Sequence, residues 1–576
     1  MSLNKKILYN GITFLILLIF SFFINQYYGY QGLTPLDDFL NYNCGYRILI
    51  GDIPFKDYYS VTGPVLCLTQ SFFYKLFGVS WFSLVVHASV LNCIFCGIFY
   101  FFLKKIKVNI YFIFLFCISL SVLGYPNNGV PGVDHHAWIL SLCSLLFFYV
   151  GLIQKNKIIF LLSPILLFIG FLVKQVPSAY FLVLISFVYF IYSIKKKNFY
   201  LFKELCFISL ACIFVLIFAL KIYSIEISDF IEQYFYLSLN LGSNRLEGIS
   251  YDFFQEKLSN IYFLFFLILP LIINYIFFYY KLRKDFELSI INFDFFIALS
   301  LIFICYFYEL HTNNAAMSFV ALPIVAFFTY QIQHKVKNIN SLNYVYSLII
   351  FYSWFRLGQS NFYVAAFEFF LFLIVIIFLI LKRKKLFCTQ VLLFVYLVFS
   401  TIYYFQTSID SRKYKDINRD NAYLSFNGSE IDKSFKNLNW NTSYKLNKDQ
   451  EKKDFLSKIN LLKKLDQNYI FITDYQIYNS ILNMIDYSPV KYWHTGVSYP
   501  SKDSKYRLKF ENFFRKKIIQ NDIKFLIIDD KVSVFNESIK DFNFLNKCTF
   551  DVKNLINDNI LVYQINNLCV KNFNNY

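Results

Sequence analysis

The chain has 576 residues, of which 57% are hydrophobic, 22% are aromatic and only 16% are charged, and its mean hydropathy is +0.47. Soluble domains carry about 25% charged residues, so this composition excludes an ordinary soluble protein and predicts an integral membrane protein. The formal net charge of +18 would suggest nucleic-acid binding in a soluble protein, but here Lys and Arg gather at the ends of apolar runs, which predicts a membrane topology and no nucleic-acid partner.

A transmembrane helix needs about 20 mainly apolar residues, or fewer where the bilayer adapts. The first run, Ile7 to Ile24, has no small-residue cleavage site after it, so we expect a retained helix and not a signal peptide. About thirteen runs in the chain are suitable spans, at residues 7–25, 82–103, 109–124, 136–153, 158–173, 177–194, 203–223, 260–280, 293–309, 316–333, 342–357, 361–381 and 386–405.

The basic clusters predict the orientation of these spans. If every run crosses once, all the clusters fall on one side, which the positive-inside rule assigns to the cytoplasm together with the N-terminus. The clusters are Lys5/Lys6, Lys104/Lys105/Lys107, Lys155/Lys157, Lys195/Lys196/Lys197, Lys281/Arg283/Lys284, His334/Lys335/Lys337 and Lys382/Arg383/Lys384/Lys385.

Two units are predicted along the chain. Residues 1–405 form a polytopic α-helical module whose first outer loop covers residues 26–81, and residues 406–576 form a small extracytoplasmic α/β domain. After residue 406 Lys, Asp and Asn become frequent, and short β-branched and aromatic runs alternate with helical stretches. Strands are expected at 469–473 and 524–528, and helices at 452–465 and 510–520.

The first outer loop contains the stretch LDDFLNYNCGYRILIGDIPFKDYYSVTGP, from Leu36 to Pro64, in which charged residues interrupt apolar ones. Residues 38–50 have the spacing of a short amphipathic helix, with Phe39, Tyr42 and Tyr46 on one side, which predicts a helix lying on the membrane face. Residues 65–78 are too short and polar for a secure span and predict a second interfacial or re-entrant helix.

Acidic residues beside a bilayer are costly to desolvate, so Asp37 and Asp38 are candidates for a general base or a metal ligand. The alternative is that one of them only caps the helix. Asp134, His135 and His136 form a second candidate at the outer mouth of the fourth span, where the alternative is a helix cap followed by interfacial imidazoles. Together with Asp37 these three residues are candidate ligands for a divalent cation, Mg, Mn or Zn.

Several basic residues are expected on the outer side, where the positive-inside rule disfavours them. Lys56, Lys174 and Arg356 would suit an anionic phosphate or pyrophosphate at the membrane face, although each alternatively reaches toward lipid headgroups. The twelve cysteines lie mostly in apolar runs without a metal-ligand spacing, so we expect small buried apolar residues and neither a metal site nor a disulfide framework. Nucleotide-binding, zinc-protease and serine-hydrolase motifs are absent.

The first outer loop resembles that of the large helical GT-C glycosyltransferases. The matching pattern is D-D-x(8)-R-x(3)-G-x-I-P-F-x-D-Y-x(3)-T-G-P, beginning at Asp37 and ending at Pro64. This family includes protein O-mannosyltransferases, the aminoarabinose transferases of lipid A, oligosaccharyltransferases and bacterial dolichyl-phosphate-mannose-mannosyltransferase-like proteins. The resemblance covers about residues 1–405, and thirteen spans with an extracytoplasmic C-terminal domain also look like the aminoarabinose transferase and oligosaccharyltransferase plan. The chain has DD where many members have DE.

The resemblance implies that a sugar is transferred from a polyprenyl-phosphate-linked donor to a glycan, lipid or protein acceptor at the outer face of a bacterial inner membrane. It places the catalytic or metal-associated carboxylate on Asp37, with Asp38 as second choice, and a second carboxylate on Asp134. Lys56, Lys174 or Arg356 would balance the departing phosphate. The alternatives are a multi-span transporter or lipid flippase, and a cell-surface glycan polymerase or ligase; intramembrane carboxylates and internal repeats, which transporters usually have, are not evident in this sequence.

Overall fold

The computed structural model describes two parts of the chain and the residues that join them. The described residues are 3–105, 108–123, 129–154, 156–197, 199–239, 425–441, 447–529, 542–552 and 560–573, with isolated positions between 398 and 406.

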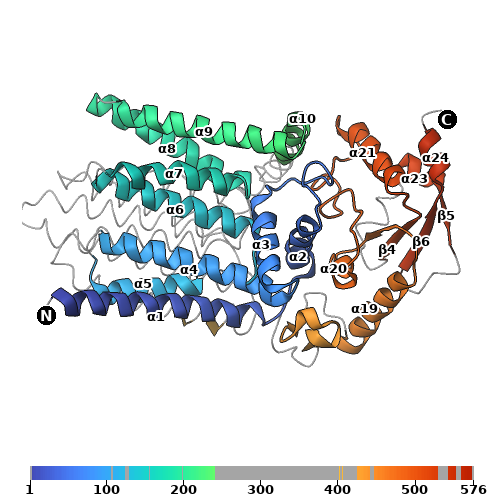
Figure 1. Ribbon diagram of the computed structural model, residues 1–576, viewed down its shortest axis with the longest axis horizontal. Helices are drawn as coiled ribbons and strands as arrows, with labels where there is room; N and C mark the ends of the chain where they lie inside the picture. Colours follow the sequence, from blue (N-terminus) through green and yellow to red (C-terminus); the bar gives the residue numbers. More distant parts are fainter. Residues whose placement is uncertain are drawn as a thin grey trace, which may run out of the picture.

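Long helices of the N-terminal half lie side by side as a bundle (Figure 1). They coincide with the seven predicted spans between residues 7 and 223, because each apolar run continues until a basic or polar turn. The other six predicted spans fall outside the described residues, apart from isolated positions near residue 400. The bundle helices are α1 (Leu3–Gly29), α4 (Trp81–Lys105), α5 (Ile110–Leu123), α6 (Val133–Gln154), α7 (Lys157–Phe171), α8 (Gln175–Lys196) and α9 (Tyr200–Ile222).

Three of the described helices are long and apolar enough to cross a membrane: Leu8–Gly29, Trp81–Lys105 and Phe202–Ile222. Large apolar side chains remain exposed along α1 and α9, including Phe23 on α1 and Phe214 on α9, which are 64% and 71% exposed. Water would not stabilise such surfaces, whereas lipid tails would. The chain is therefore a mainly helical protein whose apolar helices suit a membrane.

Two shorter helices, α2 (Pro35–Leu49) and α3 (Val65–Phe77), lie across one end of the bundle, between it and the C-terminal part (Figure 1). The prediction of two helices in this loop is confirmed. The environment expected for α2 was wrong, because its apolar side chains Phe39, Tyr42 and Tyr46 pack into a core shared with the C-terminal part and not against lipid.

The C-terminal part is built around a four-stranded sheet in the order β3-β4-β6-β5. Strand β3 pairs in parallel with β4, and the other two pairings are antiparallel. The two predicted strands and the two predicted helices are all present, because each has a clear local pattern. The elements are β3 (Tyr469–Ile472), β4 (Phe525–Asp529), β5 (Thr549–Asp551), β6 (Ile560–Ile565), α19 (Lys448–Lys463), α20 (Tyr478–Leu482), α21 (Arg507–Gln520), α23 (Asn543–Cys548) and α24 (Asn567–Asn572).

Short elements connect the bundle and the sheet. A small antiparallel ladder pairs Phe426 with Trp440, and Asn439 of this ladder donates its backbone N–H over 2.9 Å to the oxygen of Tyr30, the residue after α1. The connecting elements are α10 (Ile227–Ile231), the π-helical turn η1 (Glu232–Tyr236), β1 (Phe426–Asn427), η6 (Gly428–Glu430), η7 (Lys433–Phe435) and β2 (Asn439–Trp440).

Two disulfides correct the expectation that the cysteines form no such framework. Cys44 of α2 is bonded to Cys67 of α3, and Cys548 at the end of α23 is bonded to Cys569 of α24. Both bridges lie in segments predicted to be extracytoplasmic. The free cysteines of the described residues all lie in bundle helices; Cys96, Cys117 and Cys143 are buried as expected, Cys93 and Cys212 are partly buried, and Cys206 is exposed, against the expectation.

Candidate functional site

The acidic pair Asp37 and Asp38 lies in the first turn of α2, where negative charge interacts favourably with the helix dipole. Asp38 is 3% exposed, and its Oδ2 accepts a hydrogen bond of 2.6 Å from the backbone N of Thr34, the residue that caps the helix. Asp37 is exposed. The two predicted roles therefore separate: Asp38 holds the start of the helix, and Asp37 is the exposed carboxylate of the pair.

Asp134 and Lys174, both predicted site residues, form an ion pair. Asp134 is in the first turn of α6, Lys174 is the residue before α8, and Lys174 Nζ lies 2.5 Å from Asp134 Oδ1. Each side chain is 23% exposed, so the pair is only partly shielded from water. Lys174 was predicted to bind a phosphate directly; here it is held by a carboxylate, and the residue before it, Val173, contacts Gly63 of the first loop.

The segments that carry the two candidate carboxylates meet at Asn41 of α2. Its Nδ2 donates to the backbone oxygen of Asp37 over 3.0 Å and to that of Pro131, three residues before Asp134, over 2.8 Å. Gly129 in the same loop sits against the end of α1, where a Cβ would lie 2.5 Å from the backbone N of Gly29. The loop before α6 is thus fixed beside the first turn of α2.

The glycine of the T-G-P sequence marks a third close approach. Gly63 N donates to Val173 O over 2.9 Å, and a Cβ at Gly63 would lie 1.8 Å from the backbone oxygen of Leu172. Only glycine permits this contact without movement of the backbone. The contact joins the end of the first loop to the turn that carries Lys174, so the loop and the ion pair belong to one arrangement.

The two histidines are buried, with His135 1% and His136 4% exposed. His136 Nδ1 lies 3.1 Å from Gly132 O, and its Nε2 lies 3.1 Å from Nε2 of His87 in α4, whose Nδ1 lies 2.8 Å from Gln70 Oε1. With both imidazoles neutral, His136 donates to Gly132 O and accepts from His87, so His87 Nδ1 needs a donor. The Gln70 amide supplies it when its nitrogen is turned toward His87, and each ring then donates once and accepts once. Both ring nitrogens of His136 are therefore occupied.

These contacts do not suit the predicted divalent-cation site of Asp37, Asp134, His135 and His136. Asp134 is paired with Lys174, and His136 uses both nitrogens in the bundle. Among the residues that the structure describes, no group of three or more His, Cys, Asp or Glu side chains lies close enough to hold a metal ion. The set does not fit Mg, Mn or Zn as arranged, so no chemical step is assigned to a metal.

Two of the three predicted phosphate-binding cations, Lys56 and Lys174, lie among the residues that the structure describes. Lys56 is exposed in the tight turn of residues 55–57, in which Phe55 has a φ of 70°. Lys174 is paired with Asp134, and Arg356 lies outside the described residues. Of the described cations in this group, Lys174 is the one that contacts a candidate carboxylate, Asp134.

Arg47, to which no role was assigned from the sequence, joins α2 to the C-terminal part. Its Nε donates to Asp52 Oδ2 over 2.8 Å, and its Nη2 and Nη1 donate to the backbone oxygens of Ser488 and Val490 over 3.0 and 3.3 Å. Its guanidinium also lies 4.0 Å from the centre of the Tyr58 ring. No local pattern indicates partners that are more than 400 residues away along the chain.

Asp57, also unassigned, shapes the loop itself. Its Oδ2 accepts from the backbone N of Ile53 over 2.8 Å, and its backbone oxygen accepts from Lys517 Nζ on α21. Nearby, Gln233 of η1 accepts from Ser60 N over 3.1 Å and donates to Phe55 O over 3.0 Å. The first loop is thus held from three directions: the bundle, the α10–η1 segment and the C-terminal part.

Neither a protein-family model nor any curated protein matches this chain. The resemblance of the first loop to GT-C glycosyltransferases therefore remains a prediction.

Proposed function

We propose that the protein is a membrane glycosyltransferase that moves a sugar from a polyprenyl-phosphate-linked donor to an acceptor hydroxyl at the extracytoplasmic face of a membrane. The observation that carries the proposal is the exposed Asp37 at the start of α2, with the Asp134–Lys174 pair on neighbouring turns of the same bundle end. In this reading the complete transmembrane module has about thirteen spans.

The proposed reaction is a displacement at the anomeric carbon. The acceptor oxygen forms a bond to that carbon while its proton passes to the Asp37 carboxylate, and the bond from the carbon to the phosphate oxygen breaks. The electron pair leaves with the polyprenyl phosphate, whose negative charge Lys174 stabilises. Asp134 is a positioning residue in this scheme, because its Oδ1 lies 2.5 Å from Lys174 Nζ and fixes where that ammonium group is held.

The positions of the disulfides support the proposed side of the membrane. Disulfides persist in oxidising compartments and are rare in the cytosol. The Cys44–Cys67 and Cys548–Cys569 bridges lie in the first loop and in the C-terminal part, the two regions that the distribution of Lys and Arg assigns to the outside.

The proposal is tested with purified protein in liposomes that contain a radiolabelled polyprenyl-phosphate sugar, with an extract of the native cell envelope as the acceptor source. We expect label to move from the lipid-soluble donor to an acceptor fraction, with release of polyprenyl phosphate. A flippase would change the leaflet in which the donor resides without releasing polyprenyl phosphate. Movement of intact donor between leaflets with no released phosphate would therefore overturn the proposal.

A further inference from the structure

The helical segment that follows α9 has an exposed apolar face. From α10 through η1 and the turn after it, exposed apolar side chains recur every four residues, which places them on one side of the helix. We call this face the apolar stripe. It consists of Ile227, Ile231, Phe235 and Leu239, with Tyr236 beside them, and these residues are between 36% and 65% exposed. An exposed apolar surface of this kind indicates contact with a partner or with a membrane.

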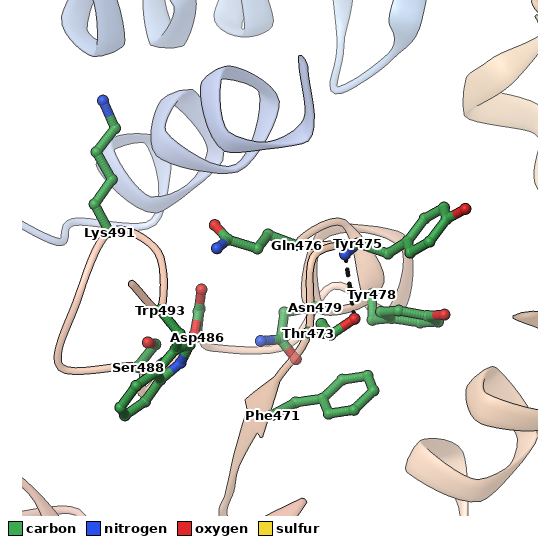
Figure 2. A pocket seen from close by; sticks show the side chains of 10 residues that line it. All are labelled: Phe471, Thr473, Tyr475, Gln476, Tyr478, Asn479, Asp486, Ser488, Lys491 and Trp493. Carbon is green, nitrogen blue, oxygen red and sulfur yellow. Dashed lines mark hydrogen bonds between the residues drawn. The ribbon is translucent and has the colours of Figure 1, made fainter. Parts of the chain in front are cut away.

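The opposite face of the same segment is buried and holds the first loop. Phe230 is 3% exposed and packs in a small core, and Glu232 Oε1 accepts a hydrogen bond of 3.2 Å from the Tyr59 hydroxyl. Lys491 of the C-terminal part reaches the same loop, where its Nζ donates to Thr62 Oγ1 over 2.8 Å (Figure 2). The apolar stripe is therefore fixed in position relative to the first loop.

The beginning of α21 in the C-terminal part extends this surface. Tyr506 stacks on Tyr236 with their ring centres 5.8 Å apart, and Lys509 Nζ lies 2.6 Å from Asp229 Oδ1. Leu508 stands between these two contact residues in the chain and is 69% exposed. A large apolar side chain of the C-terminal part thus lies close to the apolar stripe and is as exposed as the stripe itself.

The polar border of this surface contains Tyr and Lys. The ammonium group of Lys505 lies 5.0 Å from the ring centre of Tyr506 and 5.8 Å from that of Tyr236. Residues 226–239 carry three acidic side chains and no basic one, whereas residues 502–509 carry four basic side chains and one acidic one. These charges cancel, so apolar contact and not net charge selects the partner. Tyr and Lys are the side chains that lie at lipid headgroups above an apolar surface.

The apolar stripe continues the exposed surface of α9. The apolar part of that helix, Phe202–Ile222, is long enough to cross a membrane and only 11% of its most apolar window is buried. Ile227, the first residue of the stripe, follows five residues after the end of the helix. Amphipathic helices at a membrane surface bury their apolar face about 5–10 Å into the boundary between headgroups and acyl chains. The continuity with α9 therefore favours the lipid bilayer as the partner.

We propose that the apolar stripe and Leu508 insert into the boundary of the lipid leaflet that faces the C-terminal part. Lys505, Tyr236 and Tyr506 then lie at the level of the headgroup phosphates. The inference goes beyond the proposed glycosyltransferase function and does not depend on it. Because the buried face of the same segment holds the first loop, insertion of the stripe fixes the height of that loop above the membrane.

Photo-crosslinking of the full-length protein in phosphatidylcholine liposomes tests this contact. The photoreactive residue p-benzoylphenylalanine replaces Ile227, Leu508 or Phe214, one position at a time, and mass spectrometry of the irradiated protein detects covalent lipid adducts. We expect lipid adducts at all three positions, with Phe214 of α9 as the positive control. The matched negative control is Leu568, a leucine that is 73% exposed on α24, away from the bundle (Figure 1), where no adduct above background is expected.

A second measurement does not depend on the photoreactive residue. In the same liposomes, Leu508→Glu should raise the hydrogen–deuterium exchange rate of amides 502–509 roughly 3- to 10-fold, because less apolar surface enters the lipid. Leu568→Glu should leave these rates unchanged. Non-reducing mass spectrometry for the Cys548–Cys569 bridge checks that each variant is folded.

Three results would overturn the inference. The first is a yield of lipid adducts at Leu508 no higher than at Leu568, and the second is crosslinking of Leu508 to protein in place of lipid. The third is an unchanged exchange rate in Leu508→Glu. Absence of lipid adducts at Phe214 as well would show that α9 does not face lipid, which removes the continuity on which the inference rests.

Discussion

Replacement of Arg47 by alanine should weaken the interface between α2 and the C-terminal part. Arg47 is 1% exposed, and it is the partner of Asp52 and of two backbone oxygens at Ser488 and Val490. Removing one partner of a buried ion pair destabilises by about 3–5 kcal/mol. The Asp52 side chain is 18% exposed and partly solvated, which lowers the cost of leaving it without Arg47. The two carbonyls that lose their donors add about 1 kcal/mol each. The expected loss remains about 3–5 kcal/mol.

Hydrogen–deuterium exchange in detergent measures this loss where it occurs. In Arg47→Ala, amides in residues 486–491 and in α2 should exchange roughly 100-fold faster or more, because the interface opens at lower free energy. Arg47→Lys should lie between the two, since it keeps the charge and loses the planar fork. Lys75→Ala, at an exposed position on α3, is the control and should change nothing. Wild-type exchange rates in Arg47→Ala would refute the view that this residue fastens the interface.

Three further predictions concern the same region. Burial lowers the pKa of Lys491 to about 7 from 10.5, so between these pH values the folded state binds fewer protons than the unfolded state. The free energy of unfolding should therefore rise from pH 7 toward pH 10, by up to about 1.4 kcal/mol per pH unit. Thermal unfolding of Lys491→Met should lack this part of the rise. Mass spectrometry of unreduced digests should find Cys44 joined to Cys67, and a Cys44→Ser/Cys67→Ser variant should be less stable by roughly 3–4 kcal/mol; free thiols at both positions in the wild type would contradict the pairing. Gly63→Ala should lower the thermal midpoint because its Cβ would meet Leu172 O, whereas Gly11→Ala, with nothing within 4 Å, should not; equal midpoints would contradict the close contact.

Local pattern was sufficient to predict most of the described secondary structure. The seven bundle helices, the two helices of the first loop and the strands β3 and β4 were all anticipated, because each is specified by a continuous apolar run or a clear periodicity. The surface against which α2 packs was not anticipated. The apolar face of α2 suits lipid or protein equally well, and the residues that cover it, such as Phe435 and Trp440, are almost 400 positions away.

The candidate site was predictable in part. Residue types and spacing identified Asp37, Asp38, Asp134 and Lys174, but not the difference between the two aspartates, which depends on the bond from Thr34 N to Asp38. The ion pair between Asp134 and Lys174 joins two different turns and has no local signature. The disulfides did leave a signal, since each bonded cysteine lies in a segment predicted to be outside the membrane.

The most direct test of the central claim is the rate of donor cleavage by Asp37→Asn in liposomes, measured as released polyprenyl phosphate. Loss of a general base should lower the rate about 10²- to 10⁴-fold while insertion and thermal stability stay normal, because Asp37 is exposed. Asp503→Asn, the same change at an exposed position in the C-terminal part, should retain the wild-type rate. A normally inserted Asp37→Asn protein with the full wild-type rate would contradict the assignment of Asp37 as the catalytic base.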